Sequence, residues 1–301
     1  MNKNSTYRCG YVALVGRPNV GKSTLLNHIL GQKLSITSRK PQTTRHRLLG
    51  IKTTDTSQII YVDTPGMHLK AAKAINRYMN RTASSSIDDV HAVVFIIEAL
   101  KWTDEDEMVL TRIKQSSIPV ILAVNKVDRI SDKESLLPFL QDVAKKHDFK
   151  DIIPISALKN INVSELELLL ETFIDISEAF YPEEQITDRS SRFLAAEIVR
   201  EKLMRTLGQE LPYNITVEIE QFKEEKNRLL INALIWVERD NQKAIVIGKN
   251  GLQLKKVGVQ AREDMQRLFD RKIHLELWVK VKEGWSDDER ALQSLGYTDE
   301  L

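Results

Sequence analysis

Cysteine is almost absent from this chain. Its 301 residues include a single cysteine, Cys9, so no disulfide can form within the chain, as is typical of proteins in a reducing cytosol. No apolar run approaches the ~20 residues of a membrane span, and residues 1–8 are too few and too polar for a signal peptide. The 44 basic and 42 acidic residues leave a formal net charge of only +2. We therefore expect a cytoplasmic protein, and the total charge indicates no partner.

Length and composition are sufficient for two folded domains. The chain is 42% hydrophobic and 29% charged, which lets 301 residues bury two cores. Strand-like and helix-like segments alternate through residues 1–178, which predicts an α/β domain with a mostly parallel sheet and one antiparallel hairpin at 53–57. A proline and acidic residues break this rhythm, and we interpret 179–188 as a linker to a second domain at 189–301. The expected strands of the first domain are 11–15, 47–52, 58–63, 92–97, 118–124 and 151–155, and its helices are 24–30, one running through 78–86, two starting at 104 and 132, and 163–176.

The most informative motif is Gly-Arg-Pro-Asn-Val-Gly-Lys-Ser at 16–23. It follows an apolar run and opens a helical pattern, and a strand, glycine-rich loop and helix in that order form a cradle for phosphates. Lys22 would bring its charge to the β- and γ-phosphates, and Ser23 would offer a hydroxyl to Mg²⁺. The alternative, a glycine turn without a ligand, is disfavoured by the complete motif in this context. The predicted phosphate-binding residues are Gly16, Arg17, Pro18, Asn19, Val20, Gly21, Lys22, Ser23 and Thr24.

A second motif, Asn125-Lys126-Val127-Asp128, ends an apolar strand and indicates which base is bound. The Asp128 carboxylate can accept from the N1–H and the exocyclic amine of guanine, groups that adenine lacks in that arrangement. Asn125 would tie this loop to the phosphate loop, and the stem of Lys126 would cover one face of the base. An ordinary strand-end turn is the alternative for so short a match. The run Ser156, Ala157 and Leu158 follows the next strand, and its backbone N–H would face the guanine carbonyl.

Two polar loops would sense the γ-phosphate. Asp63-Thr64-Pro65-Gly66 closes a strand, so Asp63 would hold Mg²⁺ through water and the Gly66 N–H would reach the γ-phosphate. The basic loop at 41–45 carries two threonines at the distance where a second Mg²⁺-binding hydroxyl is needed. We favour Thr44 over Thr43, and the alternative for either is a solvated loop residue.

Together these motifs resemble the translation-factor-like class of small GTPases. Met67 stands where Ras-like proteins carry the glutamine that orients the attacking water, and an apolar side chain cannot do so. Asn19 matches the asparagine that in several such GTPases holds K⁺ between the phosphates, although Asn19 also suits a loop position with unusual φ. His68 as a general base is a weaker hypothesis. The candidate catalytic residues are Lys22, Thr44, Gly66 and Asn19.

The second domain carries a nucleic-acid motif. Its expected order is a helix at 191–207, strands at 213–221 and 228–238, helices at 242–247 and 252–269, and a strand at 272–280, which resembles a type II KH domain. Gly-Lys-Asn-Gly at 248–251 lies between the two later helices, where its glycines admit a nucleic-acid backbone to a groove for about four single-stranded nucleotides. Residues 241–260 contain four lysines and no acid, and the alternative reading is a solvated helix face. The predicted RNA-binding residues are Lys243, Gly248, Lys249, Asn250, Gly251, Lys255 and Lys256.

GTPase motifs followed by GxxG, with Pro-Gln-Thr-Thr-Arg at 41–45 and Asp-Thr-Pro-Gly-Met-His at 63–68, closely resemble the Era family of bacterial GTPases over essentially the whole chain. The resemblance implies a factor for 30S ribosomal subunit assembly that binds the single-stranded 3′ region of small-subunit ribosomal RNA. GTP would be required for tight binding and hydrolysis for release. Peripheral association with the inner membrane is also implied, though nothing in the composition shows it, and no DNA partner is expected.

Two functional classes stay open on the residues alone. In the first, the chain is an RNA-binding switch that uses GTP hydrolysis as a timer. In the second, it is a signalling GTPase whose KH fold contacts protein or membrane. The acid-free lysine strip beside GxxG favours the first class.

Overall fold

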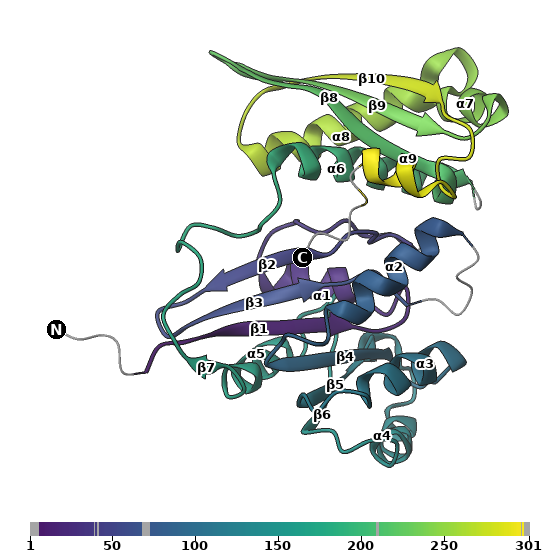
Figure 1. The fold of residues 1–301 in the computed structure, drawn as a ribbon. Helices are drawn as coiled ribbons and strands as arrows, with labels where there is room; N and C mark the ends of the chain where they lie inside the picture. The colour runs from purple at the N-terminus through teal and green to yellow at the C-terminus, as the bar shows by residue number, and fades with distance from the viewer. Residues whose placement is uncertain are drawn as a thin grey trace. The chain divides into compact units, whose positions relative to one another are not determined.

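A computed structural model describes residues 6–38, 40, 42–67, 73–208, 211–295 and 297. The described residues form two compact units (Figure 1). Unit 1 draws on Met1–Ser35, Thr44–Ala71 and Met79–Asp188, and unit 2 on Ile36–Thr43, Ala72–Tyr78 and Arg189–Leu301. Two short segments that precede residue 79 thus cluster with the C-terminal residues. The linear boundaries 1–178, 179–188 and 189–301 stay a prediction.

Unit 1 is built on a seven-stranded sheet with the order β2-β3-β1-β4-β5-β6, and β7 pairs with β1. The predicted hairpin is present as the antiparallel pair β2 and β3, β7 is antiparallel to β1, and the other pairs are parallel, so the mostly parallel sheet is confirmed. Every residue of β3 and β5 is buried, as expected for strands covered on both faces. The strands are β1 Arg8–Val15, β2 Leu48–Thr53, β3 Ser57–Asp63, β4 Ala92–Glu98, β5 Val120–Asn125, β6 Asp151–Pro154 and β7 Asp175–Ile176.

The helices of the N-terminal half of the sequence are α1 Lys22–Ile29, α2 Ala74–Ser85, α3 Asp104–Ile113, α4 Leu136–Ala144 and α5 Val163–Glu171, with short 3-10 helices η1 Val127–Arg129 and η2 Lys133–Ser135. The first half of α2, up to Tyr78, clusters with unit 2. The helix expected from 132 begins as a 3-10 turn, and Pro138 then occupies the first turn of α4, where no N–H is needed. The helix expected to reach 176 ends at Glu171. Ile174 packs on Gly10, so a Cβ at Gly10 would lie 2.8 Å from Ile174 Cγ2, and the next two residues form β7.

Residues 179–188, predicted as a linker, contact the sheet of unit 1. The Ile51 N–H donates to the Ile186 carbonyl at 2.9 Å, and the Leu49 N–H donates to Asp188 Oδ1 at 3.0 Å. The Tyr181 N–H donates to Gln58 Oε1 at 2.9 Å. This stretch therefore has defined partners along β2 and β3.

Unit 2 contains a separate sheet with the order β10-β9-β8, in which β8 is antiparallel and β10 parallel to β9. Helices α6 and α8 lie side by side on one face of it (Figure 1), and their apolar residues form one core with the strands. The predicted α-β-β-α-α-β order is confirmed. The elements are α6 Ser191–Thr206, η3 Leu211–Asn214, β8 Ile215–Glu225, β9 Arg228–Val237, α7 Asp240–Ile247, η4 Lys249–Gly251, α8 Leu252–Phe269, β10 Ile273–Val281 and α9 Glu289–Ser294. Within the described ranges, no helix combines the length and apolarity needed to cross a membrane.

Candidate functional site

The phosphate loop joins the end of β1 to the first residue of α1. Gly21 precedes the helix with φ 112°, and a Cβ there would lie 2.3 Å from Asn125 Nδ2, so the position requires glycine. Lys22 is buried, and its ammonium donates to the carbonyls of Gly16 at 2.8 Å and Arg17 at 3.0 Å. The loop thus curls around its own lysine, which places that charge where phosphates would lie.

Burial, and to a lesser extent the charge of Arg17, lower the pKa of Lys22 from 10.5 to about 8, although Asp63, Asp106 and Glu105 oppose the shift. A bound polyphosphate would favour the charged ammonium, so binding above this pKa must take up a proton. We expect GDP affinity to be about tenfold weaker at about pH 9 than at about pH 7. Calorimetric titration in two buffers of different ionisation enthalpy would measure both the affinity and the proton uptake. Equal affinity at both pH values would contradict this prediction.

Three oxygen-bearing side chains meet at the start of α1. Ser23 Oγ lies 2.8 Å from Thr44 Oγ1 and donates to Asp63 Oδ2 at 2.9 Å. Asp63 is fully buried, and burial raises its pKa although hydrogen bonds from Ser35 and Ser23 oppose this. The structure brings Thr44 to this cluster, whereas the Thr43 hydroxyl donates to the Lys40 carbonyl at 2.7 Å. Of the two threonines left open on the sequence, Thr44 is the one beside Ser23.

The base-recognition loop follows β5. Asn125 Nδ2 donates to the Val20 carbonyl at 2.7 Å, and Asn125 Oδ1 accepts from the Ala157 N–H at 3.0 Å. The Asn125 side chain therefore connects the end of β5 both to the phosphate loop and to the 156–158 turn. The sequence predicted the connection to the phosphate loop but not the one to the turn. Ser156 Oγ donates to Asp128 Oδ1 at 2.5 Å, which orients the carboxylate expected to face guanine.

Sequence reasoning missed a set of charges beside these two loops. Glu98, the last residue of β4, accepts from Lys126 Nζ at 2.9 Å and from Arg17 Nη2 at 3.3 Å. Arg17 Nε also donates to Asp106 Oδ2 at 3.0 Å, and Asp106 is fully buried. No sequence motif identifies an acidic residue at the end of a strand. The one signal for Glu98 was that it ends its strand, as Asn125 does, so both lie at the carboxyl end of the parallel sheet.

The residues proposed for catalysis differ in how far the structure describes them. Met67 is 5% exposed and packs in the core of unit 1, consistent with an apolar side chain that cannot orient water. Asn19 has φ 64°, a positive value of the kind expected if the asparagine is there for its loop conformation rather than to hold K⁺. Gly66 is described, with its backbone against Pro18. His68 lies outside the described residues.

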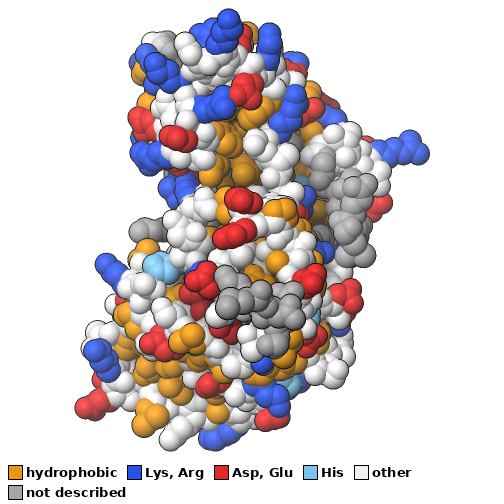
Figure 2. All heavy atoms as spheres, turned by 90° about the vertical axis from the view of Figure 1, so that its left-hand side faces the viewer, with side chains coloured by type: hydrophobic (Ala, Val, Ile, Leu, Met, Phe, Trp, Pro, Cys, Tyr) orange, Lys and Arg blue, Asp and Glu red, His pale blue; other side chains and the backbone are white. Residues whose placement is uncertain are grey.

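The GxxG loop connects α7 to α8 through η4. Gly248 has φ 72° and ψ 174°, and Gly251 and Asn250 also have positive φ, so the chain turns sharply at the start of α8. Lys249, Lys255 and Lys256 are exposed and Lys243 is half-buried. Basic side chains also gather at the end of unit 2 where β8 meets β9 (Figure 2). These include Lys223, Lys226, Arg228, Arg271 and Lys272, and two of them pair with Glu224 and Glu225.

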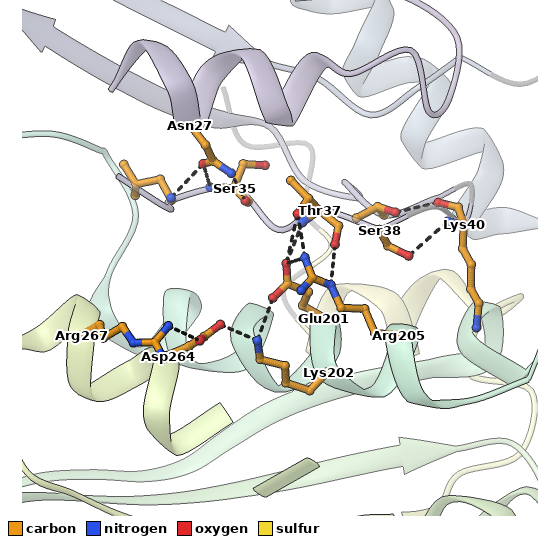
Figure 3. Close-up of polar contacts among 12 residues, drawn as sticks. Asn27, Ser35, Thr37, Ser38, Lys40, Glu201, Lys202, Arg205, Asp264 and Arg267 are labelled. Atoms are coloured by element: carbon orange, nitrogen blue, oxygen red, sulfur yellow. Dashed lines mark hydrogen bonds and ion pairs between the residues drawn. The ribbon is translucent and has the colours of Figure 1, made fainter. Parts of the chain in front are cut away.

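Of the described residues between 36 and 43, three contact α6 or the residue after it within unit 2, namely Thr37, Lys40 and Thr43, and Figure 3 shows the polar contacts of Thr37. The Thr37 N–H donates to Glu201 Oε1 at 2.9 Å, and Glu201 is fully buried. Arg205 donates from Nε to the Thr37 carbonyl at 3.1 Å and from Nη2 to Glu201 Oε1 at 2.9 Å. Lys40 reaches the Leu207 carbonyl and Arg200 reaches the Thr43 carbonyl. We call the three residues Thr37, Glu201 and Arg205 the α6 clasp. No sequence motif predicted these contacts.

Fold and site together define a P-loop GTPase domain joined to a KH domain. A family model described as a 50S ribosome-binding GTPase matches residues 11–126, and a KH domain model matches residues 210–286. GTPase Era of Pseudomonas syringae pv. tomato is 62% identical over 99% of this chain and 100% of that protein, and GTPase Era of Glaesserella parasuis is 60% identical over the full length of both. The chain belongs to the Era family of GTPases, so it hydrolyses GTP to GDP and phosphate.

Two solved structures share both domains with this chain. An Era variant from Aquifex aeolicus bound to GDP and AlF₄⁻ superposes with a TM-score of 0.93 at 41% identity, covering 97% of this chain and 99% of that one. Era in complex with MgGDPNP and nucleotides 1506–1542 of 16S ribosomal RNA gives a TM-score of 0.94 at the same identity and coverage. The resemblance inferred from the motifs is thereby confirmed.

Proposed function

We propose that this GTPase is a molecular switch that binds the 3′ region of small-subunit ribosomal RNA and assists 30S subunit assembly in the cytoplasm. The observation that carries the proposal is the GxxG turn at the start of α8, flanked by exposed lysines. Support comes from the solved Era complex with nucleotides 1506–1542 of 16S ribosomal RNA. Association with the inner membrane stays a prediction that rests on the family resemblance alone.

The nucleotide pocket suits GTP or GDP with Mg²⁺. Asp63 Oδ1 is buried without a hydrogen-bond partner, while Ser23 Oγ donates to the other carboxylate oxygen and lies 2.8 Å from Thr44 Oγ1. Hard oxygens of hydroxyl, carboxylate and phosphate groups are the ligands that Mg²⁺ prefers, so this orphaned oxygen fits a hydrated ion. When bound, Mg²⁺ would neutralise charge between the β- and γ-phosphates. Lys22 would bind those phosphates, and the Gly66 N–H would contact the γ-phosphate.

The RNA side of the proposal rests on charge and backbone access. At Gly248 and Gly251 no side chain blocks a phosphodiester backbone from the start of α8, and Lys249 between them is exposed. Lys255 and Lys256 continue the positive charge along the helix. Such contacts bind phosphates rather than particular bases, so affinity should fall steeply with salt.

Filter binding with single-stranded RNA of the 3′ region tests this function. Lys249→Glu should weaken RNA binding about tenfold and reduce the salt slope, because it replaces attraction by repulsion beside the bound backbone. Its GTP affinity should be unchanged. The matched control is Lys145→Glu, the same charge change at the exposed lysine that follows α4, which should leave RNA binding intact. An unaltered affinity in Lys249→Glu would instead favour a KH domain that contacts protein or membrane.

Switching itself is tested by comparing nucleotide states. Thr37 and Thr43 bond to side chains of α6, and the next residue, Thr44, belongs to the cluster at Ser23. If a γ-phosphate orders this loop, the form bound to a GTP analogue should bind RNA more tightly than the GDP form, and RNA should in turn favour GTP. Identical RNA affinity in the GTP-analogue, GDP and nucleotide-free states would show that the nucleotide does not control RNA binding, and the switch proposal would be wrong.

A monovalent cation is the candidate substitute for the missing glutamine. If Asn19 helps to hold K⁺ between the phosphates, GTP hydrolysis should be about tenfold faster in KCl than in NaCl at equal ionic strength, since the ion neutralises charge that develops in the transition state. Asn19→Ala should abolish the difference between the salts. Steady-state phosphate release measures both rates, and equal rates for the unmodified protein would exclude the cation role.

A further inference from the structure

Glu98 lies at the carboxyl end of the parallel sheet, where the phosphate loop and the base-recognition loop both begin. It ends β4, which lies between β1 and β5 in the sheet, and it is the register partner of Asn125. The carboxyl ends of parallel strands meet at one edge, so the loops that follow β1 and β5 flank this residue. The phosphate loop approaches on one side, and the loop with Lys126 approaches on the other.

The Glu98 carboxylate bonds to both loops at once. It accepts from Lys126 Nζ at 2.9 Å and from Arg17 Nη2 at 3.3 Å. Arg17 is in turn fixed from the far side, because its Nε donates to Asp106 Oδ2 at 3.0 Å. Asp106 belongs to the capping box of α3 and also accepts from the Thr103 N–H at 3.0 Å. A continuous chain of charges therefore runs from the cap of α3 through the phosphate loop to the base-recognition loop.

Glu98 is ionised where it makes these contacts. Burial alone would raise its pKa, but the bonds from Lys126 and Arg17 outweigh burial and leave the pKa below its ordinary value. The Lys126 backbone has φ 70°, a left-handed conformation that is unfavourable for a non-glycine residue. The ion pair therefore offsets local backbone strain while it aims the lysine side chain.

We propose that Glu98 is a positioning residue for guanine binding: it holds the Lys126 ammonium so that the lysine stem lies along one face of the base. Asp106 performs the corresponding task for Arg17, which keeps the phosphate loop at a fixed distance from the base loop. Asn125 was already expected to join these loops, and Glu98 provides a second, ionic connection between them. Because Asp106 also holds Arg17, we expect the effect of Glu98 on the nucleotide to pass through Lys126.

A double-mutant cycle on GDP affinity tests this pathway. Glu98→Gln keeps the shape of the side chain and removes its charge. It should weaken GDP binding about fivefold, because the variant loses a charge-assisted hydrogen bond whose strength is already reduced by partial exposure to water. Lys126→Met should weaken binding more, because the ammonium is lost. In the Lys126→Met background, Glu98→Gln should have no further effect, because the residue through which it acts is gone.

Two controls separate positioning from general stability. Asp88 pairs with Arg112 at 2.7 Å in unit 1, and residue 88 precedes the start of β4, at the opposite end of the strand from Glu98. Asp88→Asn should leave GDP affinity unchanged, and the nucleotide-free Glu98→Gln and Asp88→Asn proteins should melt within a few degrees of each other. Unaltered GDP affinity in Glu98→Gln, or additive losses in the double variant, would overturn the proposal.

Discussion

Asp128→Asn should change the preferred nucleotide from GTP to xanthosine triphosphate. Asparagine presents an amide donor where the guanine N1–H and amine need an acceptor, whereas xanthine carries a carbonyl in place of that amine. Leaving buried polar groups unpaired costs more than losing an apolar contact, so GTP affinity should fall roughly hundredfold or more while affinity for the xanthine nucleotide rises. Competition binding against a fluorescent GDP analogue would measure both affinities.

The neighbouring serine supplies the control for this exchange. Ser156 Oγ donates to Asp128 Oδ1, so Ser156→Ala removes the group that orients the carboxylate but leaves the acceptor in place. GTP affinity should then fall by about fivefold, without any gain for xanthosine triphosphate. If Asp128→Asn bound GTP as tightly as the unmodified protein, Asp128 would not be the residue that recognises guanine.

Glu201→Ala should destabilise unit 2 strongly. Glu201 is fully buried and accepts from the Thr37 N–H, while Arg205 and Lys202 pair with its two oxygens. Truncation would leave the Thr37 N–H without its acceptor and open a buried space, whereas Lys202 would keep its ion pair with Asp264 and water would solvate the half-exposed Arg205. We expect the free energy of unfolding to fall by about 3 kcal/mol. Urea denaturation followed by tryptophan fluorescence measures this, since Trp236, Trp278 and Trp285 lie in unit 2.

An exposed ion pair in the same unit provides the comparison. Glu225 pairs with Arg228 at 3.1 Å in the β8–β9 hairpin, where the side chains are 35% and 53% exposed respectively. Glu225→Ala should cost less than about 0.5 kcal/mol because water screens the pair. A similar, small loss in Glu201→Ala would mean that the α6 clasp contributes little to stability, and the role given to its burial would be wrong.

The sequence predicted the parts of the site that depend on neighbours in the chain. A strand, Gly21-Lys22-Ser23 and a helix are contiguous, and Gly248 and Gly251 adopt positive φ where the GxxG pattern places them. The mostly parallel sheet followed from alternating strand and helix patterns in the same way. Turn chemistry and hydrophobic periodicity are local signals, so they survive without knowledge of the tertiary structure.

What the sequence did not reveal depends on residues that are far apart. Arg17 and Asp106 are 89 positions apart, and Thr37 and Glu201 are 164 apart, so no pattern within a window could pair them. The two-residue strand β7 was read as the end of a helix because it is too short to show periodicity. Its place is set by Ile174 against Gly10, a packing contact between opposite ends of the first domain's sequence.

The assignment of residues 36–43 and 72–78 to unit 2 makes this protein less modular than two linked domains would be. The polypeptide passes between the units at residues 35–36, 43–44, 71–72, 78–79 and 188–189. A single cut at 188–189 would therefore separate a C-terminal fragment from two segments of its own unit, and Glu201 would lose the backbone of Thr37. Recombination that moved either half into another protein would carry away an incomplete unit, so the two halves should be inherited together.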